Sequence, residues 1–138
     1  MPYFVYFVSK IQSPTDMIQL FNIQDKFQKI TEYWSPKIAG ELNGQYVKLV
    51  KAKGEMIWHS HDDEDELFMI FKGTFVMEFR DHTATVGPGE VLIVPKGVEH
   101  CPRTEGEEEV WLILFEPQAT KHTGNIEHEM TKYEQDWI

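Results

Sequence analysis

The chain has 138 residues, 41% of them hydrophobic, which is enough for one globular domain with its own core. A formal net charge of −10 argues against a nucleic-acid partner, which needs a basic surface, and against binding to anionic membranes. The single cysteine, Cys101, excludes an intramolecular disulfide and predicts a cytoplasmic location. No apolar stretch is long enough to span a membrane, and the start MPYFVYFV lacks the basic residues and cleavage site of a signal peptide.

The first predicted element is a short helix that begins at Asn22. Asn22 is a good capping residue, and Ile23, Phe27 and Ile30 would share one face of the helix. We expect the helix to end at the Trp34-Ser35-Pro36 segment, because the residue before a proline avoids the helical conformation. Residues 1–41 are therefore interpreted as an N-terminal segment with one short helix.

From Gln45 onward the pattern is typical of strands. In residues 45–52, QYVKLVKA, Val47 and Leu49 would lie on one face and Lys48 on the other. Further strands are expected at 74–80 and 83–86, and the last, 110–116, is apolar on both faces and should be buried on both. The sequence therefore predicts an all-β domain over residues 42–117, followed by a polar tail or arm over 118–138.

Two segments carry possible chemistry, and the first is GEMIWHSHDDEDELFMIFKG at 54–73. His59 and His61 are two residues apart, so in a strand both imidazoles would point to the same face. Residues 62–65 are all acidic and are expected to form a turn. Glu66 would then begin the next strand, and the resulting hairpin would bring its carboxylate beside the two histidines.

The second segment, GEVLIVPKGVEH at 89–100, contributes a third histidine from far along the chain. Residues 91–94 form a short apolar run of strand length, Pro95 and Gly97 end it, and His100 begins the next stretch of the chain. Three imidazoles and one carboxylate suit Fe, Mn, Ni, Cu or Zn, so we predict one divalent transition metal per chain. The alternative is that these histidines are ordinary pocket or core residues, since an HxH pair alone is weak evidence for a metal.

These residues resemble the two signature motifs of the cupin superfamily. The first motif, G-x5-H-x-H-x3,4-E-x6-G, is matched except that four residues separate Gly54 from His59; the second, G-x5-P-x-G-x2-H-x3-N, is matched except that Thr104 replaces the asparagine. The resemblance implies a double-stranded β-helix, or jelly-roll barrel. It also implies that the metal ligands are His59, His61, Glu66 and His100. Flanking stretches resemble small bacterial cupins that are described as mannose-6-phosphate isomerase-like.

The direction of the ligands predicts the two faces of the strand that begins at Glu66. If Glu66 points into the barrel, Phe68 and Ile70 also point inward, and Leu67, Met69 and Phe71 point outward. Large apolar side chains on an outer face need cover, either from another layer of the same chain or from a partner subunit. Because small cupins are usually dimers, we expect a homodimer.

Two functional hypotheses remain open. One is a metal-dependent enzyme that acts on a small molecule, either as a dioxygenase or with sugar-isomerase-like chemistry. The other is a non-catalytic module whose metal holds a small ligand or stabilises the barrel. No catalytic acid or base can be assigned, since Glu55, Glu99 and Tyr46 are candidates without support. Arg80 and Arg103 are the only arginines that could clamp an anionic substrate.

The remaining candidates are expected to have ordinary structural roles. Cys101 comes directly after His100, so strand parity would point it away from the metal, and it should be a small buried hydrophobic residue. We expect His82, His122 and His128 to lie at the surface.

Overall fold

The computed structural model describes residues 13–118, 120, 122–124, 128–130 and 135–138; the apolar start of the chain, residues 1–8, lies outside this range. A 3-10 turn, η1 (Pro14–Met17), and a short helix, α1 (Ile23–Gln28), precede the strands. The strands are β1 (Lys37–Leu42), β2 (Gln45–Ala52), β3 (Glu66–Lys72), β4 (Phe75–Phe79), β5 (Thr83–Val86), β6 (Val91–Val94), β7 (His100–Thr104) and β8 (Val110–Pro117). Within the described residues, no helix has the length and apolar character needed to cross a membrane.

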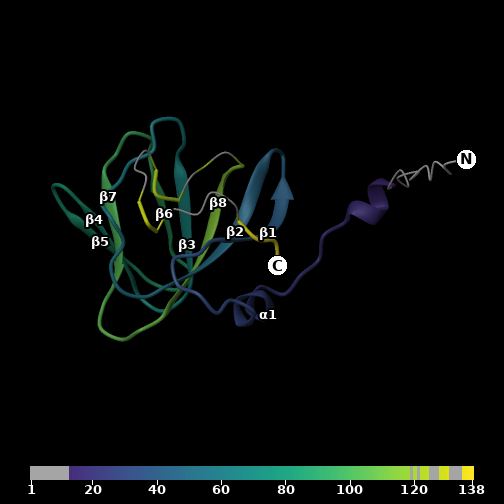
Figure 1. The fold of residues 1–138 in the computed structure, drawn as a ribbon, viewed down its shortest axis with the longest axis horizontal. Coiled ribbons are helices and arrows are strands. Elements are labelled where there is room, and N and C mark those ends of the chain that lie inside the picture. The colour runs from purple at the N-terminus through teal and green to yellow at the C-terminus, as the bar shows by residue number, and fades with distance from the viewer. Residues whose placement is uncertain (1–12, 119, 121, 125–127, 131–134) are drawn as a thin grey trace, which may run out of the picture.

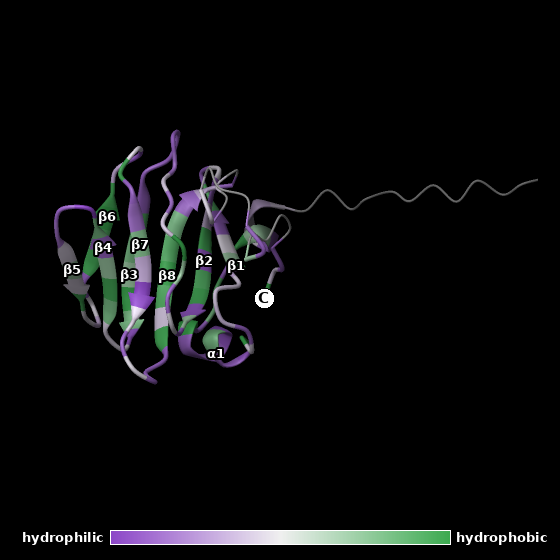
Figure 2. Cartoon of the chain, turned by 60° about the vertical axis from the view of Figure 1, so that its left-hand side comes forward, coloured by the Kyte–Doolittle hydropathy of each residue, from purple (hydrophilic) through white to green (hydrophobic). Residues whose placement is uncertain are grey.

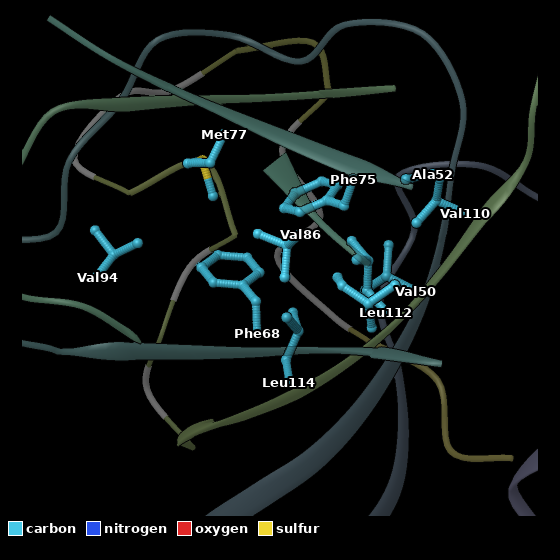
Figure 3. Close-up of a cluster of buried hydrophobic side chains, with 11 residues drawn as sticks. Val50, Ala52, Phe68, Phe75, Met77, Val86, Val94, Val110, Leu112 and Leu114 are labelled. Carbon is cyan, nitrogen blue, oxygen red and sulfur yellow. The ribbon is translucent and has the colours of Figure 1, made fainter. Parts of the chain in front are cut away.

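The strands form two antiparallel sheets, one ordered β1-β2-β8-β3-β6 and the other β5-β4-β7 (Figure 1). This confirms the predicted all-β jelly-roll architecture. The main core lies between the sheets, with Phe75 and Met77 of β4 facing Phe68 of β3 and Leu114 of β8 (Figure 3). Such interdigitated apolar side chains supply most of the stabilisation of a two-sheet fold.

The outer face of the larger sheet carries a second apolar cluster, which α1 covers. Phe27 of α1 is fully buried and stacks on Trp111 and Phe71, with ring centroids 4.9 and 5.6 Å apart. The predicted direction of β3 is confirmed, since Phe68 and Ile70 are buried on the inner face while Met69 packs in the outer cluster. The cover for this part of the outer face therefore comes from the chain itself (Figure 2).

Helix α1 is shorter than predicted. Asn22 caps it as expected, with its side chain accepting a hydrogen bond from the Asp25 amide, but the helix ends at Gln28 rather than near Trp34. Trp34 has a positive φ of 54°, and its amide donates to the carbonyl of Lys51 in β2. The chain after α1 thus bonds to the sheet, and this tertiary contact replaces the helical conformation.

The C-terminal residues do not extend away from the barrel in the parts that the structure describes. Thr120, His122 and Thr123 are buried. At the end of the chain, the Ile138 amide donates to the carbonyl of Ile38 in β1 (Figure 1). The barrel also gains strand β1, which begins ahead of the predicted boundary at residue 42. Short stretches such as these carry too little periodic signal to be placed from the sequence, so their packing depends on the surface already formed by the barrel.

Replacing Gly73 by alanine should destabilise the fold more than the same change at Gly89. Both glycines have a positive φ, 85° and 80°, where a side chain costs roughly 1–2 kcal/mol. A Cβ at Gly73 would also lie 2.8 Å from the carbonyl oxygen of Glu109, whereas a Cβ at Gly89 meets nothing within 4 Å. Chemical denaturation of the two variants checks this difference, and equal losses would contradict it.

Candidate metal centre

Pairing between the two motif segments brings the predicted ligands together. His59 and His100 form an antiparallel bridge in which each backbone amide donates to the other's carbonyl, at 3.0 and 2.9 Å. The Gly97 amide also donates to the His61 carbonyl at 2.7 Å. The segment around His59 is thus extended, as expected, although it forms isolated bridges rather than a full strand. Glu66 begins β3 and completes the group.

The four side chains form one compact buried cluster. One ligand-type atom from each of His59, His61, Glu66 and His100 lies within 4.8 Å of the others. All four residues are at most 5% exposed. The imidazole rings of His59 and His100 have centroids 4.3 Å apart. This is the density of nitrogen and oxygen donors that a transition metal needs.

Backbone carbonyls orient two of the imidazoles. Nδ1 of His59 lies 2.8 Å from the Ile57 carbonyl oxygen, and Nδ1 of His100 lies 2.8 Å from that of Val98. Each Nδ1 therefore carries the proton and donates, which leaves Nε2 as the unprotonated nitrogen that can bind a metal. Nε2 of His61, Nε2 of His100 and Oε1 of Glu66 are buried without a hydrogen bond of good geometry among the described residues. Buried nitrogen and oxygen atoms that converge in this way fit a cation.

The four side chains of the cluster differ in the direction and cause of their pKa shifts. Burial lowers the pKa of His59 to about 4, and burial also lowers that of His100. Burial opposes the charged forms of His61 and Glu66 as well, but their mutual contact outweighs it. The contact between the two side chains raises the pKa of His61 and holds the pKa of Glu66 below its ordinary value. In the metal-free protein, contact with Glu66 therefore favours the protonated form of His61, and a metal must displace that proton.

A family model for the cupin domain matches residues 46–116, just over half of the chain. The chain belongs to the cupin family. Solved structures support this: a cupin-2 domain containing protein from Shewanella frigidimarina NCIMB 400 is 41% identical, with 72% of this chain and 95% of that chain covered and a TM-score of 0.69. Protein NMB1881 from Neisseria meningitidis is 33% identical, with 72% and 100% covered and a TM-score of 0.65.

A curated relative, the uncharacterized protein YdbB of Bacillus subtilis (strain 168), is 38% identical over 65 residues. The match covers 46% of this cupin and 58% of YdbB, which is less than two thirds of that protein's length.

The cluster borders a small pocket inside the barrel. His59 and Glu66 line it together with mainly apolar side chains, which include Trp34, Met56, Phe68 and Leu114. The space that the centres of water molecules can occupy is about 30 Å³, enough for one or two waters in this conformation. A metal in the cluster would therefore face a small, mainly apolar cavity.

Three polar residues of the interior were not found from the sequence. Lys48 and Glu116 are each 1% exposed and form an ion pair, with Nζ 2.8 Å from Oε1. Burial and the nearby Glu66 carboxylate raise the pKa of Glu116 to about 7. The alternation predicted for β2 is correct, but the face that carries Lys48 points into the barrel. The apolar run that ends in Glu116 was the signal for this, because it shows that β8 is buried on both faces.

His122 is the third of these residues, and its predicted surface position is wrong. It is 8% exposed, it lines the pocket, and its Nε2 donates to the Met130 carbonyl oxygen at 2.6 Å. The neighbouring Gly124 explains how the chain reaches this place. A Cβ at Gly124 would lie 2.1 Å from the carbonyl oxygen of Ser60, so only glycine allows the segment to pass against the His59–Ser60 backbone.

The other candidates lie away from the pocket. Arg80 pairs with Glu99 and stacks over Trp58, while Arg103 pairs with Glu78 and Glu105. Neither arginine lines the pocket, and neither do the acid-base candidates Glu55, Glu99 and Tyr46. Arg80 and Glu99 line a separate hollow, which His59 also borders. His82 is exposed as predicted, bonded to Asp81 and stacked on Phe79. His128 is also exposed.

Cys101 is buried, as predicted, and lies near Glu55 and Glu78. Burial and the charge of Glu55 raise the pKa of its thiol to about 12. Glu78 is engaged by Arg103. Since the thiolate is the form that binds a metal, this second group of donors is a poor metal site.

Metal binding should release a proton from His61 near neutral pH. Because the pKa of His61 is raised above 6.5, more than about half of these side chains are protonated at pH 6.5, and only the neutral imidazole binds a metal. Affinity should therefore increase as the pH rises and level off above the raised pKa of His61. Calorimetric titration with Zn²⁺ in buffers of different ionisation enthalpy measures the protons released. Zero release at pH 6.5, or affinity that falls with rising pH, would contradict this assignment.

Proposed function

We propose that this cupin is a metal-dependent enzyme that acts on a small, largely apolar molecule. One divalent transition metal would be held by His59, His61, Glu66 and His100. The observation that carries the proposal is the position of this buried cluster, two members of which, His59 and Glu66, line a small and mainly apolar pocket. Concave, mainly apolar pockets with a few converging polar groups are the usual form of small-molecule sites.

Four protein ligands leave coordination positions for a substrate or dioxygen, and a redox-active ion would supply oxidative chemistry there. The surrounding residues support oxygenase chemistry over a sugar-isomerase reaction. Trp34, Met56 and Phe68 present apolar surface, whereas a sugar needs many hydrogen-bonding partners. Neither arginine lines this pocket, and Arg80, which lies beside His59 in a separate hollow, is already paired with Glu99 rather than free to bind a sugar phosphate.

Oxygen uptake by the metal-loaded protein tests this proposal. The protein would be loaded separately with Fe²⁺, Mn²⁺ or Zn²⁺ and mixed with a panel of small enediols, aromatic diols and sugar phosphates. We expect uptake with at least one enediol or aromatic diol in the iron or manganese form, and none from a His59→Ala/His61→Ala variant. Turnover of a sugar phosphate by the zinc form, without oxygen uptake, would favour the isomerase reaction instead.

The second candidate function is non-catalytic, with a metal that holds a small ligand or stabilises the barrel. The small volume of the pocket favours the stabilising role, because about 30 Å³ leaves little room for a substrate beside a metal. A purified protein that contains zinc, binds a small ligand saturably and turns over no substrate would support this alternative.

We also propose that the protein forms a homodimer in the cytoplasm. Strand β6 is the edge of the larger sheet, and its outward residues Val91 and Ile93 are 47% and 59% exposed. An unpaired apolar edge strand is a common site of association. Sedimentation of the wild type and of an Ile93→Lys variant tests this, with a dimer expected for the first and a monomer for the second. A monomeric wild type would overturn it.

A further inference from the structure

The inner face of the larger sheet changes from apolar to charged side chains at one end. Along β2 the inward residues Ala52 and Val50 are followed by Lys48, and along β8 Leu112 and Leu114 are followed by Glu116. Lys48 and Glu116 are as deeply buried as the apolar residues before them. A charged pair thus occupies positions where apolar side chains would complete the core.

The register of β3 and β8 places Glu116 beside a proposed metal ligand. Leu67 of β3 pairs with Phe115 of β8. The next residues along the two strands, Glu66 and Glu116, therefore lie opposite each other and on the same face. Two carboxylates in such positions repel each other, and a buried ion pair is rarely more stable than apolar residues of similar size. Fold stability therefore does not explain why Glu116 and Lys48 are here.

Their contacts indicate a binding role instead. Glu116 lines the same pocket as His59 and Glu66. Its Oε1 lies 2.8 Å from Lys48 Nζ but has no hydrogen bond of good geometry among the described residues. Lys48 Nζ also donates to the Thr120 carbonyl oxygen at 3.5 Å, so the lysine is held from a second direction. The pocket wall therefore presents an oriented carboxylate that can only accept hydrogen bonds when it is ionised.

We propose that Glu116, oriented by Lys48, is the ligand-positioning residue of this pocket. It accepts a hydrogen bond from a hydroxyl or N–H group of a small, otherwise apolar molecule whose neighbouring oxygen binds the metal. The ligand class is thus one that carries a metal-binding oxygen and a hydrogen-bond donor close together, as in hydroxyketones, enediols and hydroxamates. This inference rests on the proposed function, because the metal holds the other end of the ligand.

The test compares two probes that differ in one donor. Acetohydroxamate chelates a metal through its oxygens and keeps an N–H group, whereas N-methylacetohydroxamate lacks that donor. Both are titrated into Co²⁺-loaded protein, and the visible spectrum of the cobalt reports binding. The proteins are the wild type, Glu116→Gln, which keeps the shape, and Lys48→Met/Glu116→Leu, which removes both charges and leaves neither partner unpaired.

We expect the double variant to bind acetohydroxamate about tenfold more weakly than the wild type, since hydrogen bonds to charged groups are among the stronger ones. Glu116→Gln should lie between the two, and binding of the N-methyl probe should change less than about twofold in either variant. Metal content should remain the same in all three proteins, because Glu116 is not one of the proposed metal ligands.

Three results would overturn the inference. Equal affinities for acetohydroxamate in all three proteins would remove Glu116 from ligand binding and leave the metal site intact. Loss of metal from the variants alone would show that Glu116 supports the metal rather than the ligand. A wild type that binds no metal would overturn the proposed function itself, and the inference with it.

Discussion

Replacing both His59 and His61 by alanine should reduce the metal content of the purified protein from about one ion per chain to none. The two imidazoles are half of the donor set, and the two remaining donors, Glu66 and His100, are too few for a closed transition-metal site. The measurement is elemental analysis by plasma mass spectrometry of tag-free protein produced without added metal. The ion found in the wild type also indicates which reactions to assay.

The control for this experiment is a His82→Ala variant, because His82 is exposed and its contacts are with Asp81 and Phe79, outside the cluster. It should retain the metal content of the wild type. If the wild type and the double variant are both free of metal and equally stable, the histidines are pocket residues, and the metal hypothesis is wrong.

Replacing Phe27 by alanine should lower the free energy of unfolding by about 3–5 kcal/mol, the usual effect of truncating a buried aromatic residue. Phe27 is fully buried and is the residue through which α1 stacks on Trp111 and Phe71. Its removal would leave a cavity on the outer face of the larger sheet and expose part of the second apolar cluster. Urea denaturation followed by tryptophan fluorescence measures the change.

Leu20 provides the matched control, because it is 95% exposed and lies just before the same helix. Leu20→Ala should change the stability by less than about 0.5 kcal/mol. If Phe27→Ala had an equally small effect, α1 would not contribute to the stability of the barrel, and cover for the outer face would have to come from a partner subunit.

The local pattern of the sequence determined most of the strands and the members of the candidate site. Alternation and glycine punctuation place β2 through β6 and β8 close to their observed positions. The two-residue spacing of His59 and His61 was sufficient to predict a shared face, since side chains in a strand alternate. The predicted turn at residues 62–65 then brought Glu66 beside them. The predicted cluster of four residues is the one that the structure brings together.

Tertiary structure decided which environment each face of the sheet meets. Lys48 and Leu49 are both buried, one inside the barrel and the other under α1, because both faces of β2 are covered. An alternating pattern separates two faces but does not show that the polar face is buried with a partner. Glu116 supplies that partner from a strand more than sixty residues away, which local periodicity cannot reveal.

Local periodicity also could not predict the burial of the C-terminal segment or the residue at which α1 ends. His122 has no periodic neighbours, and its burial depends on the close passage of Gly124 over Ser60. Trp34 leaves the helical conformation because its amide bonds to Lys51 in the sheet. Local pattern thus determined the strands and the donor set of this cupin. Long-range contacts decided which side chains line its pocket. A buried polar group is stable only when it has a partner, and here those partners are distant in sequence.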